Sequence, residues 1–513
     1  MKEMLIFQSN MQHLAYRNAD ISTRHAHFSQ HLNIYIYFHS RASQMILKIL
    51  VHLWLALWVI FVIVFCDLFI FCVGWMHTKF YVYVAKGAAR AVVSFTSYCS
   101  SGGDTRRHIY CNLKCYFYRY SKVKCYIYTG DTDATPEEIL QKAQQRFNVV
   151  LPRNVEFVYL QTRTVVEAKH YPFLTLLMQS LASIILGAEA LGKFRPDVYI
   201  DTMGYAFTYP LFRYVAGCTV GSYTHYPTIS TDMLGRVADR VEAHNNQGFI
   251  ARSSVLSTIK LGYYHLFAFI YSLVGRCAHV VMVNSSWTHG HISTLWGTTT
   301  NLHIVYPPCD TQKFKSLNSI PDKDKDPKTI VSIGQFRPEK DHPLQLRSFK
   351  HLCNIIDEEL AKQVRLVLIG GCRNEEDKQR VEALKALSVQ LGISDQVIWK
   401  LNCPFPQLLE SVQNGMIGLH TMWNEHFGIC VVECMAGGLV MLAHDSAGPK
   451  MDIITEYDGQ QTGYLASDEQ SYACAMKTIL EASDDERDCI RRAAKASVDR
   501  FSDEVFEGSF MEA

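Results

Sequence analysis

Two glutamates, Glu425 and Glu433, are separated by seven residues in a stretch that reads as a loop entering a helix. Apolar runs at 415–421 and 439–444 flank it, so the order strand, loop, helix, strand is predicted. Gly428 lets the backbone approach a ligand at the loop-to-helix turn, and the free amides of a helix's first turn favour an anion. Carboxylates beside an anion need neutral polar partners such as sugar hydroxyls. The spacing suggests a nucleotide-sugar site; the alternative is a loop acid and a solvated helix acid.

A second group of residues follows another predicted strand. Gly334 ends the apolar run 329–334, and Arg337 and Lys340 come directly after it. An arginine and a lysine at such a turn can neutralise a diphosphate leaving group, the arginine by bidentate contact and the lysine as a point charge, in place of a metal. The alternative, a pair of solvated cations, does not explain their position after a strand-end glycine.

The first half of the chain contributes His225, which follows the predicted strand 219–224. This histidine could hydrogen-bond a transferred sugar near its reacting carbon or orient an acceptor hydroxyl, although a lone histidine is more often structural. Gly448-Pro449 provides either a further backbone turn at the ligand site or an ordinary β-turn. Asp131 and Asp133 have the spacing of a metal-binding pair but no second acidic ligand nearby, so a turn or helix cap is preferred and no metal site is predicted.

Short β-rich runs alternate with helical patterns from residue 91 onward, which is typical of parallel sheets covered on both faces. The predicted strands of a first series are 91–95, 124–128, 156–160, 197–200, 219–224 and 279–283; those of a second series are 329–334, 364–371, 396–399, 415–421 and 439–444. The fold class is therefore α/β, with two Rossmann-like doubly wound domains. A ligand is expected in the cleft where the carboxyl ends of their strands face one another.

Composition limits the function classes. A chain of 513 residues allows two domains plus an appendage, and a net charge of +1 gives no indication of a nucleic-acid partner. The 16 cysteines are scattered without a CxxC pair, which indicates neither a zinc site nor a disulfide framework and favours a reducing cytosolic compartment.

The N-terminal region predicts a membrane anchor. Residues 45–76 contain the apolar run 49–66, long enough to cross a bilayer as one helix, and cleaved signal peptides have shorter apolar regions. The basic residues that follow favour a cytosolic catalytic part. Two further apolar segments, 173–186 and 261–275, are either buried core helices or helices lying against the membrane surface.

Five regions are accordingly predicted. They are a disordered tail at 1–44, the transmembrane anchor at 45–76, an acceptor domain at 88–310, a nucleotide-sugar domain at 328–485 and a C-terminal helix at 486–513. The hydrophilic run 321–327 reads as the linker between the two domains.

Assembled in this order, the motifs of the second half resemble those of the retaining GT-B glycosyltransferases of family 4. Longer strings resemble the GDP-mannose-dependent alpha-1,2-mannosyltransferases that assemble the lipid-linked oligosaccharide of asparagine glycosylation. These strings lie at 197–207, 225–233, 281–287, 334–340 and 420–428, within a resemblance that covers roughly residues 124–510.

The resemblance implies an enzyme that transfers mannose from GDP-mannose to dolichol-diphosphate oligosaccharide on the cytosolic face of the endoplasmic reticulum, without a metal or other cofactor. By the same resemblance, Glu425 contacts the mannose hydroxyls, His225 lies beside the reacting centre, and Glu433 binds the ribose. The donor diphosphate would be bound by Arg337 and Lys340 after Gly334, and the backbone of Phe427, Gly428 and Ile429 would face the phosphate and sugar. Other early-pathway mannosyltransferases and the endoplasmic reticulum membrane are expected partners, and nucleic acid is not.

One stretch departs from the family pattern. The glycine-rich loop after the first strand is expected to carry acceptor-side residues, here Gly102 and Gly103, but the amphipathic helix that should follow is missing. Either an exon is misread around residues 100–123 or the protein is a degraded copy. Two alternatives therefore stay open: a related retaining transferase with another nucleotide-sugar, and a non-catalytic paralogue.

Overall fold

The computed structural model describes residues 91–96, 124–147, 155–230, 232–233, 254–297, 301–317 and 327–513. All of them belong to one compact unit, Ala88–Ala513. The predicted tail at 1–44, the anchor at 45–76, Gly102, Gly103 and most of the predicted linker at 321–327 lie outside the described residues.

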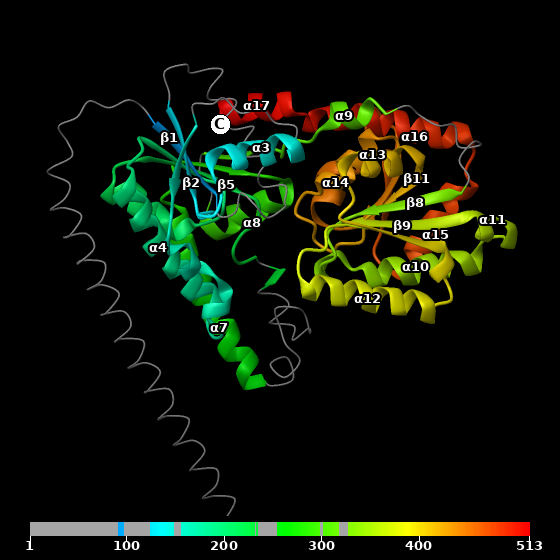
Figure 1. The fold of residues 1–513 in the computed structure, drawn as a ribbon, viewed down its shortest axis with the longest axis horizontal. Helices are drawn as coiled ribbons and strands as arrows, with labels where there is room; N and C mark the ends of the chain where they lie inside the picture. Colours follow the sequence, from blue (N-terminus) through cyan, green and yellow to red (C-terminus); the bar gives the residue numbers. More distant parts are fainter. Residues whose placement is uncertain are drawn as a thin grey trace, which may run out of the picture. The chain divides into compact units, whose positions relative to one another are not determined.

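The first half forms a seven-stranded parallel sheet in the order β3-β2-β1-β4-β5-β6-β7. Figure 1 labels β1, β2 and β5 of this sheet. This order is that of a doubly wound Rossmann-like sheet. All six predicted strands are present, and the sequence reading missed only the short last strand. The strands are β1 (Ala91–Thr96), β2 (Lys124–Thr129), β3 (Glu156–Tyr159), β4 (Val198–Asp201), β5 (Thr219–Thr224), β6 (Val280–Val283) and β7 (Leu302–Ile304).

The second half repeats this plan in a six-stranded sheet, ordered β10-β9-β8-β11-β12-β13 and also parallel throughout. The five predicted strands are present, and β13 was not foreseen. The strands are β8 (Lys328–Ile333), β9 (Val364–Gly370), β10 (Val397–Leu401), β11 (Gly415–Leu419), β12 (Val440–His444) and β13 (Gly463–Ala466). The prediction of two doubly wound sheets is therefore confirmed.

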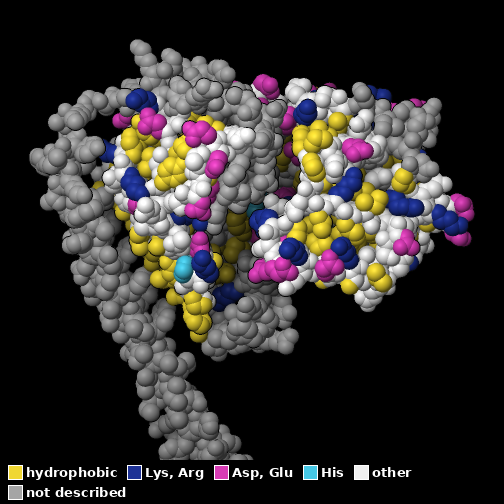
Figure 2. All heavy atoms as spheres, viewed as in Figure 1, with side chains coloured by type: hydrophobic (Ala, Val, Ile, Leu, Met, Phe, Trp, Pro, Cys, Tyr) yellow, Lys and Arg dark blue, Asp and Glu magenta, His cyan; other side chains and the backbone are white. Residues whose placement is uncertain are grey.

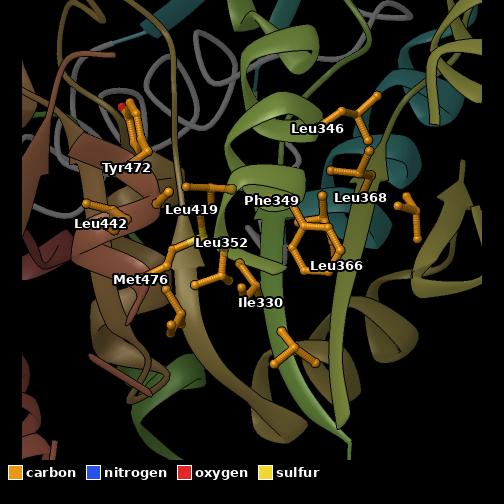
Figure 3. Packing of buried hydrophobic residues seen from close by; sticks show 14 of the residues in the cluster. Ile330, Leu346, Phe349, Leu352, Leu366, Leu368, Leu419, Leu442, Tyr472 and Met476 are labelled. Atoms are coloured by element: carbon orange, nitrogen blue, oxygen red, sulfur yellow. The ribbon is translucent and has the colours of Figure 1, made fainter. Parts of the chain in front are cut away.

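Helices cover both faces of the second sheet because alternate strand residues point to opposite sides. On one face, Ile330 and Leu366 pack against Phe349 and Met476, which come from α10 and α15 (Figure 3). On the other face, the neighbouring strand residues pack mainly against α14 and α16. The helices of this half are α10 (His342–Ile355), α11 (Glu358–Gln363), α12 (Glu375–Gln390), α13 (Phe405–Asn414), α14 (Ile429–Ala436), α15 (Glu469–Glu481) and α16 (Asp484–Ser497).

The first sheet is covered on one face by α4 (Thr175–Lys193), α7 (Ser254–Gly275) and α8 (Ser286–Trp296). Its other face receives the last helix of the chain, α17 (Asp503–Glu512), whose Phe506 and Phe510 are buried with Ile127 and Met282. The other α-helices in the described part of the chain are α3 (Pro136–Phe147) and α9 (Thr311–Lys315). The chain thus returns to the first sheet after completing the second.

The strand order fixes where a ligand can bind. In the second sheet the winding direction reverses between β8 and β11, which are hydrogen-bonded neighbours. The loops that leave the carboxyl ends of these two strands diverge there and open a crevice for ligands. Gly334 to Lys340 form one of these loops and His420 to Gly428 form the other.

Candidate active site

The loop after β8 is held tightly at its start. Gly334 follows the strand directly, and its amide donates to the carbonyl of Ile369 at 2.9 Å. The chain then forms a 3-10 turn, Pro338–Lys340, before Asp341 caps α10 with its side chain, at a left-handed φ of 45°. Arg337 precedes this turn with a partly exposed side chain, 3.6 Å from Glu339.

The loop after β11 contains two left-handed residues, Asn424 at φ 52° and Gly428 at φ 110°. Glycine meets the requirement at residue 428 without steric cost, whereas Asn424 is strained. Gly428 is also the N-cap residue of α14, which begins at Ile429. The prediction of a loop entering a helix at this glycine is confirmed.

The two loops meet through an ion pair. The Lys340 ammonium donates to the Glu425 carboxylate at 2.5 Å, and Nε2 of His420 lies 3.1 Å from the same oxygen. The Glu425 side chain is only 13% exposed. Burial by itself raises the pKa of this carboxyl, but Lys340 and the hydrogen bond from His420 outweigh burial and hold it well below its ordinary value. Glu425 is therefore an anion throughout the physiological pH range.

A third loop, which follows β12, packs against the loop after β11. Gly448 donates its amide to the carbonyl of Glu425 at 3.0 Å. A Cβ atom at this glycine would lie 2.5 Å from the carbonyl oxygen of Phe427, so only glycine permits this approach. The Gly448-Pro449 pair begins a π-helical turn, Pro449–Ile453, so the β-turn alternative is wrong.

The side chains of Phe427 and Ile429, which follow Glu425, are buried. The Phe427 side chain is 3% exposed and packs on the rings of Tyr306 and Phe501, so only its backbone can face a ligand. Ile429 is buried in the same way. Glu433 lies half-buried on α14, one turn after Ile429.

His225 comes directly after β5 and packs its ring against Tyr223, with 4.8 Å between centroids. Burial and the nearby His426 lower the pKa of His225 to about 4, so the imidazole is neutral at pH 7. Because His426 follows Glu425 in sequence, the structure brings His225 of the first half near the loop that carries Glu425.

Sequence reasoning assigned no role to several residues here. His420 supports Glu425, while Tyr226, Asp232 and Trp287 of the first half contact the β11 loop. The signal for His420 was its position at a strand's carboxyl end. The other contacts join segments about 140 to 200 residues apart, for which one sequence contains no signal.

Within the described ranges, no three His, Cys, Asp or Glu side chains are placed to hold a metal ion. Lys340 and Arg337 supply positive charge at the site.

Two family models match the chain. The model for the ALG11 mannosyltransferase N-terminus matches residues 89–296, which includes the departing stretch 100–123, and the model for glycosyl transferases group 1 matches residues 314–496.

Curated relatives cover most of this chain. A Xenopus laevis protein is 50% identical over 451 residues, which are 88% of this chain and 92% of the relative. A Homo sapiens protein is 51% identical over 82% of this chain and 85% of the relative. Both are named GDP-Man:Man(3)GlcNAc(2)-PP-Dol alpha-1,2-mannosyltransferase.

Solved structures of low sequence identity share the fold. An Anabaena protein, HepE, in complex with UDP and glucose has a TM-score of 0.56 at 16% identity and covers 82% of this chain and 98% of its own. The N-terminal domain of a Candida albicans trehalose-6-phosphate phosphatase has a TM-score of 0.61 at 11% identity, covering 83% of this chain and 96% of its own. The two doubly wound sheets are thus those of a GT-B glycosyltransferase, and the chain belongs to the ALG11 mannosyltransferase family.

Proposed function

We propose that this protein transfers mannose from GDP-mannose, in alpha-1,2 linkage and with retention of configuration, to dolichol-diphosphate-linked oligosaccharide. The names of relatives that are about half identical over most of the chain support this substrate pair. The observation that carries the proposal is the Lys340–Glu425 pair at the topological switch point of the second sheet. This pair places a cation that can bind a diphosphate beside a carboxylate that can accept hydrogen bonds from sugar hydroxyls.

Each of the site residues has a role in this proposal. Arg337 and Lys340 bind the donor diphosphate beside Gly334, and the backbone of Phe427, Gly428 and Ile429 faces the phosphate and the sugar. Glu425 accepts hydrogen bonds from mannose hydroxyls, and Glu433 does so from the ribose. Because the pKa of His225 is lowered to about 4, this residue offers a neutral hydrogen-bonding group beside the reacting carbon.

The transfer step uses charge and position. The bond between the anomeric carbon and the diphosphate oxygen breaks, and an acceptor hydroxyl forms a bond to that carbon on the same face. The hydroxyl proton passes to the departing diphosphate oxygen, which serves as the base. Arg337 and Lys340 stabilise the charge that develops on the diphosphate in the transition state, as preorganised cations do in other transferases. Transfer is accordingly expected to persist in EDTA.

The first half also offers a surface for a lipid-borne substrate. Of the described helices, α4 alone has the length and hydropathy of a membrane span, yet its Leu186 and Ala190 are buried against the first sheet. This helix therefore belongs in part to the core of the first half. The outer side of α7 exposes Phe269 at 61% and Leu273 at 49%, and Figure 2 shows apolar side chains over both helices. We propose that this side lies on the membrane.

The membrane surface can be tested separately from catalysis. F269E/L273E in the full chain is expected to lower transfer to an acceptor embedded in a bilayer but not to a short-chain acceptor in detergent. V389E, on the exposed side of α12, is the matched control and should change neither. Equal losses with both acceptors would contradict the membrane role.

The remaining assignments are also proposals. Single-pass anchoring through residues 45–76 would place the catalytic domains on the cytosolic face of the endoplasmic reticulum, where other early-pathway mannosyltransferases would be its partners. The acceptor domain would comprise residues 88–310 and the nucleotide-sugar domain residues 328–485, with a C-terminal segment at 486–513 and acceptor-side contacts at Gly102 and Gly103.

The proposed activity is tested with purified full-length protein, labelled GDP-mannose and a dolichol-diphosphate acceptor carrying Man(3)GlcNAc(2). We expect labelled product that an alpha-1,2-specific mannosidase removes, and no product with UDP-glucose. Transfer from UDP-glucose alone would select a different nucleotide-sugar. Donor binding without transfer would contradict the proposal and favour the non-catalytic paralogue.

A further inference from the structure

Three side chains of the first half contact the loop that carries Glu425. Asp232 accepts a hydrogen bond from the Asn424 side-chain amide at 2.6 Å, and the Tyr226 ring stacks on His426 with 4.2 Å between centroids. Trp287 lies behind them, 5.2 Å from the His426 ring. Asn424 and His426 are the immediate neighbours of Glu425, so these contacts lie next to the residue proposed to hold the donor sugar.

This position matters because of the geometry of transfer. Reacting atoms must approach to about 3–3.5 Å before reaction, so an acceptor sugar has to lie directly against the donor sugar. Its binding groups must therefore come from the first half and reach the Glu425 loop. Among the described residues, Asp232 and Tyr226 meet both conditions and are also accessible, at 36% and 37% exposure. Trp287 is only 8% exposed and supports the side chains of Asp232 and Tyr226 from the protein interior.

The chemistry of the two residues suits a sugar. A carboxylate accepts hydrogen bonds from hydroxyl groups, and an aromatic ring presents an apolar face on which the C–H face of a pyranose can pack. No lysine or arginine in the described part of the chain pairs with Asp232. Its second neighbour is the largely buried His291, whose Nε2 lies 3.7 Å away. Trp287 packs edge-on against the His291 ring at 4.0 Å, which fixes the position of that ring.

We infer that Asp232 and Tyr226 form the binding subsite for the terminal mannose of the acceptor, with Asp232 accepting hydrogen bonds from non-reacting hydroxyls of that sugar. The inference rests on the proposed function, since it requires a mannose acceptor. Trp287 and His291 are positioning residues that hold the two contact groups in place.

A different role for the same contacts is a latch between the two halves of the unit. In that case the only role of the Asp232 carboxylate would be to accept the hydrogen bond from Asn424. The two roles differ in what happens when Asn424 is changed. N424G deletes the amide but tolerates the left-handed φ of 52°, so it removes the latch bond without adding backbone strain.

The test compares D232N and N424G in full-length protein, with the KM for the dolichol-linked acceptor and the Kd for GDP-mannose as readouts. The subsite predicts that D232N raises the acceptor KM by about 10- to 100-fold, as expected for loss of a charged hydrogen-bond partner. It predicts that D232N leaves the donor Kd within about twofold, and that N424G raises the acceptor KM by less than about threefold. Thermal unfolding of each variant shows whether it is folded.

A second pair of variants tests whether the aromatic ring of Tyr226 contacts the acceptor sugar. Y226A should raise the acceptor KM by about tenfold, the size of a lost aromatic contact, whereas Y226F keeps the aromatic face and should raise it by less than about threefold. Because these variants leave Asp232 in place, they report on the subsite even if D232N fails to fold.

The outcomes separate the possibilities. Equal effects of D232N and N424G together with a changed donor Kd would overturn the subsite in favour of the latch. Unchanged acceptor KM in both D232N and Y226A would also overturn it while leaving the proposed function intact. A wild-type protein that transfers no mannose would overturn both.

Discussion

At the residue scale, the site depends on an ion pair between side chains 85 positions apart, Lys340 and Glu425. Both are largely buried, so each charge depends on the other for stability. When a diphosphate is bound, Lys340 can share its charge between the phosphate and the acid. The pair therefore links the structure of the loop to the binding of the donor.

A double-mutant cycle can separate these two roles. K340M leaves a buried carboxylate without its cation, so the free energy of unfolding should fall by about 1–3 kcal/mol. E425Q should lower kcat by about 100-fold, as loss of a transition-state contact does elsewhere.

The double variant K340M/E425Q should recover stability to within about 1 kcal/mol of wild type and remain inactive, because no unpaired charge is left. Chemical denaturation and the mannose transfer assay supply the two readouts. A double variant as unstable as K340M would show that the pair is not what holds the loops together.

Sequence spacing predicted that these two residues lie on one sheet edge, because both follow strands of the same parallel sheet. It did not predict their direct contact or the support from His420. Such contacts depend on side-chain rotamers and loop paths, which a local pattern does not specify.

At the element scale, the loop of Glu425 is shaped by the close approach of Gly448. G448A places a methyl group against backbone atoms of Phe427, which cannot move as a flexible side chain would. The loop should shift, and the KM for GDP-mannose should rise by about tenfold or more, with a loss of about 1–3 kcal/mol in stability.

G508A is the matched control, because this glycine lies within α17 and a Cβ there meets no other atom within 4 Å. It should leave KM unchanged and raise stability by about 0.5–1 kcal/mol, since alanine is the better helix former. Equal donor KM values for G448A and wild type would contradict the role assigned to the close approach.

Most elements could be predicted because strand runs such as 366–369 are continuous, apolar and rich in branched residues. Leu302–Ile304 was missed because three residues form too short a pattern to recognise, and Gly463–Ala466 because it begins with glycine and ends with alanine, which are depleted in strands.

At the scale of the whole molecule, the last helix packs on the first sheet through Phe506 and Phe510. The sequence predicted one C-terminal helix at 486–513, whereas the chain forms α16 (Asp484–Ser497) and α17 (Asp503–Glu512), separated by a 3-10 turn at Val498–Phe501. The position of α17 was not predicted, since two phenylalanines four residues apart indicate only an apolar face. The contacts of Asp232 and Tyr226 with the Glu425 loop were also not predicted, because a local sequence pattern does not specify contacts between distant segments.

Buried histidines distributed over both halves make stability depend on pH. Burial lowers the pKa values of His225, His342 and His426 to about 4 from an ordinary 6.5. The unfolded chain therefore binds protons at a higher pH than the folded protein. This stability is fully present above pH 6.5 and is lost as pH falls towards 4, by up to about 2 kcal/mol per imidazole at pH 5.

We therefore expect the Tm to fall between pH 7 and pH 5, and to fall less in H426Q than in wild type. H170Q, at an exposed histidine, should show the full wild-type decrease. A decrease in H426Q as large as that of wild type would rule out this imidazole as a source of the acid sensitivity.

The central claim is that the donor diphosphate and sugar lie between the β8 and β11 loops. An experimental structure of the protein with GDP-mannose bound tests it most directly. We predict diphosphate oxygens within about 3 Å of the Arg337 guanidinium and the Lys340 ammonium. Mannose hydroxyls should lie on Glu425 and the ribose on Glu433. A donor bound elsewhere, such as the hollow lined by Thr455, Gln461 and Tyr464, would contradict the account.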